Sequence, residues 1–223
     1  MSRNPLSGHR ARLYQDGQDL TDPAARQSAR AYTLYYDHGI LRIFWSNFFE
    51  IAPGVFRSNQ PDLKRLQYYA KMGITSILNL RGASMSPPYL LECEFCAATG
   101  QDLIDINQLS ARKAPSRAAL LALVDTMRCT PKPFLFHCKS GADRTSLAAA
   151  IYLMVFEGAP VSTARRQFSV RFLHLKWTKS GVLDHILDVF ENEAEPRGID
   201  FETWLRTEYD GSKIQRSFDE GRA

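Results

Sequence analysis

Cysteine is scarce in this chain of 223 residues, and no long apolar run is present. The four cysteines, Cys93, Cys96, Cys129 and Cys138, are too few for a disulfide scaffold and are expected to be reduced thiols. Charged side chains interrupt the most apolar stretch, residues 31–51, whereas a transmembrane helix needs about 20 mostly apolar residues. The first residues also lack the apolar core of a secretory signal. We therefore expect a soluble, cytoplasmic protein.

A strong charge of either sign is also missing. The 28 Lys and Arg residues exceed the 24 Asp and Glu residues by only four. This small excess suits an anionic partner, but nothing resembles the dense basic stripe of a nucleic-acid-binding protein, so no nucleic acid is expected as a partner. His174 and His185 have no Cys or His at ligand spacing, so we predict no metal site and no cofactor.

The composition is that of an ordinary globular protein, with 44% hydrophobic and 23% charged residues, which excludes wholesale disorder and a coiled coil. Residues 1–28 are polar and are expected to form a flexible arm, followed by a single domain over residues 29–223. In residues 29–49, apolar side chains recur near helical spacing with a break at Gly39. We interpret this stretch as a helix packed across the core. The alternative is an amphipathic helix that lies on a membrane surface, a peripheral contact that the sequence alone does not establish.

Strand-like and helix-like segments alternate through the middle of the chain. A short segment, residues 51–56, carries a Pro-Gly turn signal and leads into an edge strand. Further strands are predicted over residues 74–80, 103–107 and 134–137, and the predicted helices between them cover residues 61–73, 89–99 and 116–127. From residue 145 to about residue 209 only helices are expected. This order predicts an α/β fold with a mostly parallel central sheet of four to five strands, flanked by helices, with extra helices at both termini.

One segment carries a chemical signal. An apolar strand ends at His137 and Cys138, a short loop containing Gly141 follows, then Arg144, and a helix begins near Thr145. In such a turn the backbone N–H groups and the helix N-terminus attract an anion, and both favour the thiolate form of the cysteine. The planar guanidinium of Arg144 can hold two phosphate oxygens. The pattern predicts phosphoryl transfer through a phosphocysteine intermediate.

The segment His-Cys-Lys-Ser-Gly-Ala-Asp-Arg-Thr, residues 137–145, resembles the His-Cys-x5-Arg-Thr signature of the cysteine-based protein tyrosine and dual-specificity phosphatases. Two upstream blocks, residues 54–61 and 77–82, are similar to those of compact atypical dual-specificity-type phosphatases. The resemblance covers roughly residues 40–190, and the chain as a whole looks most like bacterial tyrosine-phosphatase-like proteins. It implies a dual-specificity-phosphatase-like fold and metal-independent hydrolysis of a phosphorylated substrate, either protein, lipid or small molecule.

The resemblance also implies the roles of the site residues. Cys138 would be the nucleophile, Arg144 would hold the phosphate, and Thr145 would place a hydroxyl near the sulfur. His137 would support the loop and help to lower the pKa of the thiol. The phosphate would lie in a cradle of loop amides formed by Lys139, Ser140, Gly141, Ala142, Asp143 and Arg144.

Two carboxylates compete for the role of the acid that protonates the leaving group. Asp105 lies at the end of a predicted strand, 33 residues before Cys138. Asp143 lies inside the signature, in a position that resembles the in-loop aspartate of myotubularin-like lipid phosphatases. We favour Asp143, because the motif itself fixes its place, and keep Asp105 as the alternative. Asp102 is a weaker third candidate.

Other basic and thiol side chains leave their roles open. Arg81, Arg112 and Lys113 can line the mouth of the pocket, although isolated basic residues are usually just solvated. The Cys93-x-x-Cys96 pair can serve a redox function, but such a pair on a helix more often contributes to packing. Two other functions remain as alternatives to a phosphatase. One is a pseudophosphatase, a module that binds phosphate without turnover, and the other is a thiol-based sulfurtransferase.

Overall fold

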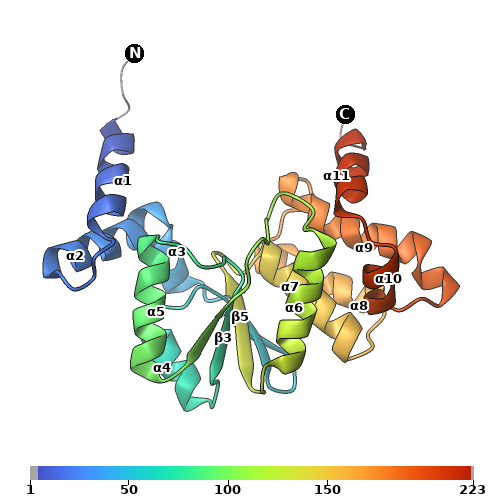
Figure 1. The fold of residues 1–223 in the computed structure, drawn as a ribbon, viewed down its shortest axis with the longest axis horizontal. Coiled ribbons are helices and arrows are strands. Elements are labelled where there is room, and N and C mark those ends of the chain that lie inside the picture. The colour runs from blue at the N-terminus through green and yellow to red at the C-terminus, as the bar shows by residue number, and fades with distance from the viewer. Residues whose placement is uncertain (1–4, 222–223) are drawn as a thin grey trace.

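The structure is a computed structural model that describes residues 5–221, which fold around a five-stranded sheet (Figure 1). The strand order is β1-β2-β5-β3-β4. The strands are β1 (Phe49–Ala52), β2 (Val55–Asn59), β3 (Ser76–Asn79), β4 (Asp102–Asp105) and β5 (Phe134–Cys138). β1 pairs with β2 in the antiparallel sense, and all other neighbours are parallel. The predicted α/β fold with a mostly parallel sheet is confirmed.

β5 is the central strand, and all five of its residues are buried. Phe134 and Phe136 belong to the larger core on one face of the sheet, and Leu135 belongs to the smaller core on the other face. A strand that is covered on both faces typically has a continuous apolar sequence, and Phe134, Leu135 and Phe136 form such a run. The run ends at His137 and Cys138, so that the cysteine lies at the carboxyl edge of the sheet.

Helices cover both faces of the sheet (Figure 1). α4 (Leu63–Lys71) and α5 (Pro87–Thr99) pack on the smaller core, to which they contribute Leu66, Tyr69 and Cys96. The larger core lies under α6 (Arg117–Cys129), α7 (Asp143–Phe156), α9 (Val182–Glu193) and α10 (Phe201–Thr207). The remaining helices of four residues or more are α1 (Pro5–Asp16), α2 (Pro23–Ala31), the π-helix η1 (Tyr32–Tyr36), α3 (Gly39–Phe44), α8 (Val161–Ala164) and α11 (Gly211–Glu220).

The stretch 29–49 differs from the expected core-packed helix. α2 continues into η1, the chain turns at Asp37 and His38, and α3 follows, so the break near Gly39 is confirmed. The interpretation as a helix packed across the core is wrong for α3, where the apolar side chains are exposed and Arg42 is the buried residue. The physical reason is a buried ion pair, in which Arg42 Nη1 lies 2.9 Å from Asp37 Oδ2 and turns the polar side of α3 inward.

The polar N-terminal stretch contains α1 and the start of α2. The Asp22 side chain caps α2 by accepting a hydrogen bond of 2.9 Å from the backbone N–H of Ala25, one of the donors that a helix N-terminus leaves without an intrahelical partner. Residues 1–4 lie outside the described part of the chain. The treatment of residues 1–28 as a flexible arm, and of residues 29–223 as a single domain, stays a prediction.

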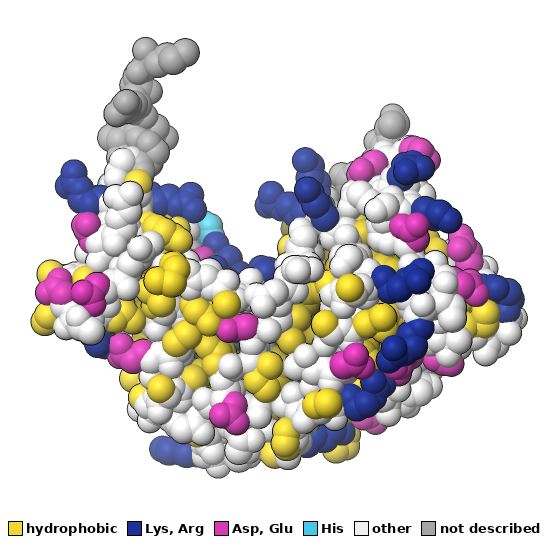
Figure 2. Space-filling model, in the orientation of Figure 1, with side chains coloured by type: hydrophobic (Ala, Val, Ile, Leu, Met, Phe, Trp, Pro, Cys, Tyr) yellow, Lys and Arg dark blue, Asp and Glu magenta, His cyan; other side chains and the backbone are white. Residues whose placement is uncertain are grey.

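The carboxyl edge of the sheet is hollowed. Figure 2 shows a deep hollow between the N-terminal helices and the loop that precedes α6, with Lys and Arg side chains on both sides of it. β2, β3, β4 and β5 all end at this edge, because the four strands run in the same direction. Within residues 5–221 no helix is long and apolar enough to cross a membrane.

Candidate active site

The loop between β5 and α7, residues 139–142, begins directly after Cys138 and leads into α7. Gly141 has a φ of 70°, and a Cβ atom there would lie 2.8 Å from the backbone of Ser58 and Asn59 in β2. A side chain therefore meets both backbone strain and a clash at this position, so only glycine allows the loop to pack against β2.

Side chains from outside the loop hold its carbonyl groups. Asn47 Nδ2 donates to the carbonyl oxygens of Ser140 and Gly141, at 3.2 and 2.9 Å, and Arg57 Nη2 donates to that of Gly141 at 2.7 Å. In a trans peptide the C=O of one residue and the N–H of the next point in opposite directions. The N–H groups of Gly141 and Ala142 therefore point away from Asn47 and Arg57, into the concave side of the loop, as an anion cradle requires.

Arg57 is a residue of the candidate site that the sequence analysis did not identify. Its side chain is fully buried in β2, and its Nη2 also donates to Ser146 Oγ at 3.1 Å. Its guanidinium carbon lies 3.8 Å from the centre of the Phe172 ring. Burial lowers the pKa of Arg57 to about 9, against the opposing effect of Cys138. The available signal was an arginine that directly follows the apolar pair Val55 and Phe56, since a buried arginine needs hydrogen-bond or ion-pair partners.

Cys138 is 2% exposed, and its surroundings favour the thiolate. Burial by itself raises the pKa of the thiol, but the positive charge of Arg144 and the polar hydroxyl and backbone N–H of the nearby Thr145 lower it more. The Asp143 carboxylate opposes them weakly. The net pKa of Cys138 is below its ordinary value, which makes the sulfur a better nucleophile at neutral pH.

The Arg144 guanidinium has few polar partners among the described residues. Nη1 donates to the carbonyl of Leu80 at 3.2 Å, and the buried Nε has no hydrogen-bond partner among the described residues. Arg144 shares a polar cavity of about 220 Å³ with Arg81, Asn79 and Tyr89. An unpaired buried donor of a charged group is costly, so the arrangement is suited to an anion in this cavity.

His137 lies beneath the loop and is completely buried. Its Nε2 is 2.8 Å from Glu92 Oε1 on α5, and its Nδ1 is 3.2 Å from the carbonyl oxygen of Cys138. Glu92 also accepts a hydrogen bond of 2.8 Å from Gln60 Nε2. The imidazole thus ties the end of β5 to α5 and fixes the backbone that carries Cys138.

The two acid candidates have different partners. Asp143, the first residue of α7, has Oδ1 at 2.8 Å from His174 Nδ1. Asp105, at the end of β4, accepts hydrogen bonds with both oxygens, from Asn79 Nδ2 at 2.8 Å and from the hydroxyl of Tyr89 at 2.6 Å. The contact with Asp105 raises the pKa of Tyr89. Both carboxylates lie near the carboxyl edge, whereas the third candidate, Asp102, begins β4 at the opposite edge.

His174 bridges two carboxylates, which the sequence did not predict. Its Nε2 lies 2.5 Å from Asp184 Oδ2, on the far side of the ring from Asp143. Burial lowers the pKa of His174, but hydrogen bonds and charge from Asp143 and Asp184 outweigh it and raise the pKa to about 9. At neutral pH the ring is therefore a buried imidazolium that fixes the Asp143 side chain at the start of α7.

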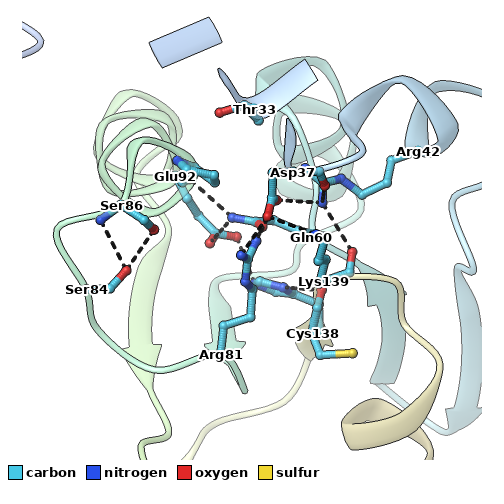
Figure 3. Close-up of polar contacts among 12 residues, drawn as sticks. Thr33, Asp37, Arg42, Gln60, Arg81, Ser84, Ser86, Glu92, Cys138 and Lys139 are labelled. Carbon is cyan, nitrogen blue, oxygen red and sulfur yellow. Dashed lines mark hydrogen bonds and ion pairs between the residues drawn. The ribbon is translucent and has the colours of Figure 1, made fainter. Parts of the chain in front are cut away.

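A second charge cluster, the Asp37 cluster, consists of Asp37, Arg42, Arg81 and Lys139 and lies beside the loop (Figure 3). Arg81 binds Asp37 with both terminal nitrogens, at 2.8 and 2.9 Å, and Lys139 Nζ lies 3.3 Å from Asp37 Oδ1. Burial raises the pKa of Asp37, but these cations and Arg42 lower it more, to about 2. The carboxylate fixes two of the basic side chains at the mouth of the site.

The other basic and thiol residues singled out from the sequence do not lie together in one site. Arg112 lines a cavity of about 380 Å³ together with Lys139, whereas Lys113 lines a different hollow near α11. Cys96 is buried in the smaller core, where burial raises its pKa to about 12, and Cys93 is half-buried. Within the part of the chain that the structure describes, no group of three or more His, Cys, Asp or Glu side chains could hold a metal ion.

Comparisons with known proteins identify the family of this chain. A family model described as "Tyrosine phosphatase family" matches residues 51–168, slightly more than half of the chain. No curated protein matches at a significant level. Among solved structures, TpbA of P. aeruginosa, crystallised as a variant in complex with pTyr, has 16% identity and a TM-score of 0.54, and the match covers 70% of this chain and 90% of that one.

Two further solved structures are similar. One is a putative phosphatase of Shewanella putrefaciens, with 17% identity, a TM-score of 0.55, and coverage of 70% of this chain and 95% of that one. The other is the core catalytic domain of the PP-IP phosphatase Siw14 of S. cerevisiae, in complex with citrate, with 17% identity, a TM-score of 0.51, and coverage of 69% and 90%. At these identities the likeness shows a shared fold.

Proposed function

Because the chain belongs to the tyrosine phosphatase family, we propose that it is a metal-independent cysteine phosphatase that hydrolyses phosphomonoesters through a phosphocysteine intermediate. The observation that carries the proposal is the pairing of a buried thiol of lowered pKa, Cys138, with Arg144 at the start of the next helix. The inward-pointing amides of the loop and the unpaired Nε of Arg144 supply the donors that a phosphate needs. The pTyr complex of the TpbA variant supports a phosphorylated substrate.

In the first step the Cys138 thiolate attacks the phosphorus atom. The S–P bond forms while the ester P–O bond breaks, and the leaving oxygen takes a proton from a carboxylic acid. In the second step water attacks the phosphorus, the S–P bond breaks, and the carboxylate takes the proton of that water. Arg144 and the loop amides stabilise the charge on the phosphoryl oxygens in both steps, and Thr145 stabilises the sulfur as it leaves.

We assign the acid to Asp143 and keep Asp105 as the tested alternative. One oxygen of Asp143 is engaged by His174, whereas both oxygens of Asp105 accept hydrogen bonds, so Asp143 keeps one carboxyl oxygen free for the leaving group. Asp143 also follows directly on the loop that would hold the phosphate, so its side chain starts close to the leaving oxygen.

The test is turnover of p-nitrophenyl phosphate in the presence of a metal chelator. We expect chelator-resistant turnover that falls by about 10⁴-fold or more in Cys138→Ser. Retained binding of phosphate or vanadate without turnover would instead support a phosphate-binding pseudophosphatase.

The acid is identified with a poorer leaving group than p-nitrophenolate, which departs without much help. With an alkyl phosphate, Asp143→Asn is expected to lower kcat by about 10²- to 10⁴-fold, and Asp105→Asn by much less. The reverse order of the two variants would move the acid role to Asp105.

A further inference from the structure

Exposed apolar side chains gather on two segments of the chain. Among the described residues, twelve large hydrophobic side chains are exposed, and nine of them lie in residues 35–45 or 170–177. The nine are Tyr35, Ile40, Leu41, Ile43, Phe44, Trp45, Val170, Leu173 and Trp177. Scattered single apolar residues are normal on a surface, but a concentration in two short segments marks an interaction site. We call these nine residues the apolar rim.

The two segments meet at the mouth of the candidate active site. Leu41 and Trp45 from the first segment and Leu173 from the second line one cavity of about 380 Å³. The same cavity is lined by Lys139 and Ser140 of the loop that follows Cys138. Three residues of the apolar rim therefore lie beside the loop that follows Cys138, and the other six belong to the same two segments.

The exposed charged side chains near this cavity are mainly basic, and its one acidic lining residue, Asp37, is buried in ion pairs. Three segments that each contribute to the lining of this cavity, residues 38–49, 106–124 and 158–183, contain no Asp or Glu. Apart from Lys113 and Arg117, which line the separate hollow near α11, their exposed basic side chains are Arg112, Arg166, Arg171, Lys176 and Lys179. Figure 2 shows Lys and Arg side chains on both sides of the hollow at this end of the molecule. A surface that is both apolar and basic complements an anionic lipid bilayer, because apolar and aromatic side chains enter the interface while Lys and Arg bind anionic headgroups.

A second copy of the chain fits this surface less well. In a symmetric dimer the same patch would face itself, and the acid-free basic segments of the two copies would repel each other. An anionic membrane supplies the opposite charge over the whole patch. It also accepts Phe44, the last residue of α3, whose side chain is 87% exposed.

We propose that the apolar rim and the basic residues around it dock the mouth of the site onto an anionic membrane surface. Docking in this way turns the loop after Cys138 toward the lipid headgroups. The consequence that a phosphorylated headgroup can reach Cys138 without leaving the membrane rests on the proposed function, whereas docking itself does not require turnover.

The test is co-sedimentation of the full chain with vesicles of phosphatidylcholine, with and without about one-third phosphatidylserine. We expect binding to the vesicles that contain phosphatidylserine, and weaker binding at high salt. Phe44→Ser is expected to lower the partition coefficient by about tenfold. Arg112→Gln is expected to lower it by about fivefold.

The matched control is Met72→Ser. Met72 is also an exposed apolar residue, but it lies at the end of α4 near the opposite edge of the sheet, so its variant should bind like the wild type. Equal losses in Phe44→Ser and Met72→Ser, or no binding of the wild type, would overturn the proposal. A dimer in sedimentation velocity that Phe44→Ser converts to monomer would overturn it as well, by assigning the surface to a second copy. Because binding is measured without turnover, these outcomes are independent of phosphatase activity.

Discussion

The strand β5 and the helix α3 both lie next to the phosphate loop, yet they are built in opposite ways. In β5 the apolar side chains Phe134, Leu135 and Phe136 are fully buried and hold the sheet between two helical layers. In α3 the apolar side chains face outward, and the buried residue is Arg42, held by Asp37. The comparison separates two tasks: burial of apolar surface fixes the position of Cys138, whereas ion pairs fix the basic side chains at the mouth and leave an apolar rim exposed.

The largest difference is expected between two substitutions of phenylalanine by alanine, one in each element. Phe136→Ala in β5 removes a fully buried side chain from the larger core, and the unfolding free energy should fall by about 3–5 kcal/mol. Phe44→Ala in α3 removes an exposed side chain, and we expect a change within about 0.5 kcal/mol. Urea denaturation of both variants measures the difference. Similar losses in the two variants would mean that α3 packs against something that its exposure does not reveal.

The Asp37 cluster provides the next test. Asp37→Asn leaves Arg42 and Arg81 without the carboxylate that both bind, so the unfolding free energy at pH 7 should fall by about 3 kcal/mol. Asp125→Asn, which removes an exposed partner of Arg128, is the control and should cost less than about 1 kcal/mol. Equal losses would show that burial of the cluster contributes nothing.

The same carboxylate gives a pH dependence with a definite sign. The pKa of Asp37 is lowered in the folded state to about 2, so its contribution to stability is present above about pH 3.8 and is lost as the pH falls toward 2. The acid unfolding of Asp37→Asn should therefore be less steep than that of the wild type. Identical acid transitions in the two proteins would contradict the assignment.

The smallest effect on the unfolding free energy is expected from His174, which contacts Asp143 at the start of α7. Its pKa is raised to about 9, so its contribution to stability is present below about pH 6.5 and is lost as the pH rises through 9, by at most about 3 kcal/mol. Unfolding free energies measured from pH 6 to pH 10 should show this decline. In His174→Gln the decline should be absent, and a decline that persists would assign it to another group.

The sequence predicted the parts of the fold and site that lie together in the chain. β5, the loop and α7 follow one another without a gap, so the apolar run, Gly141 and Arg144 could be interpreted as one unit, and the family match confirms the resemblance found there. The division into β and α layers was predicted because strands and helices alternate, which leaves few ways to cover a sheet.

The supports of the site could not be predicted, because they come from distant segments. Asn47 is 94 residues from Gly141, and Arg57 is 84 residues from it, so nothing in the local pattern links them to the loop. The pairing of His174 with Asp143 spans 31 residues, which comprise α7 and the short helices and turns that follow it. The orientation of α3 was predicted wrongly because apolar residues at helical spacing give the same pattern whether they face the core or the surface.

The central claim is that Cys138 carries the phosphoryl group between the two steps of the reaction. The most direct measurement mixes the protein with radiolabelled p-nitrophenyl phosphate, stops the reaction in denaturant within the first turnover, and locates the label by mass spectrometry. We expect the label on Cys138 in the wild type and no label in Cys138→Ser. Turnover without labelled Cys138, or label on another residue, would contradict the account.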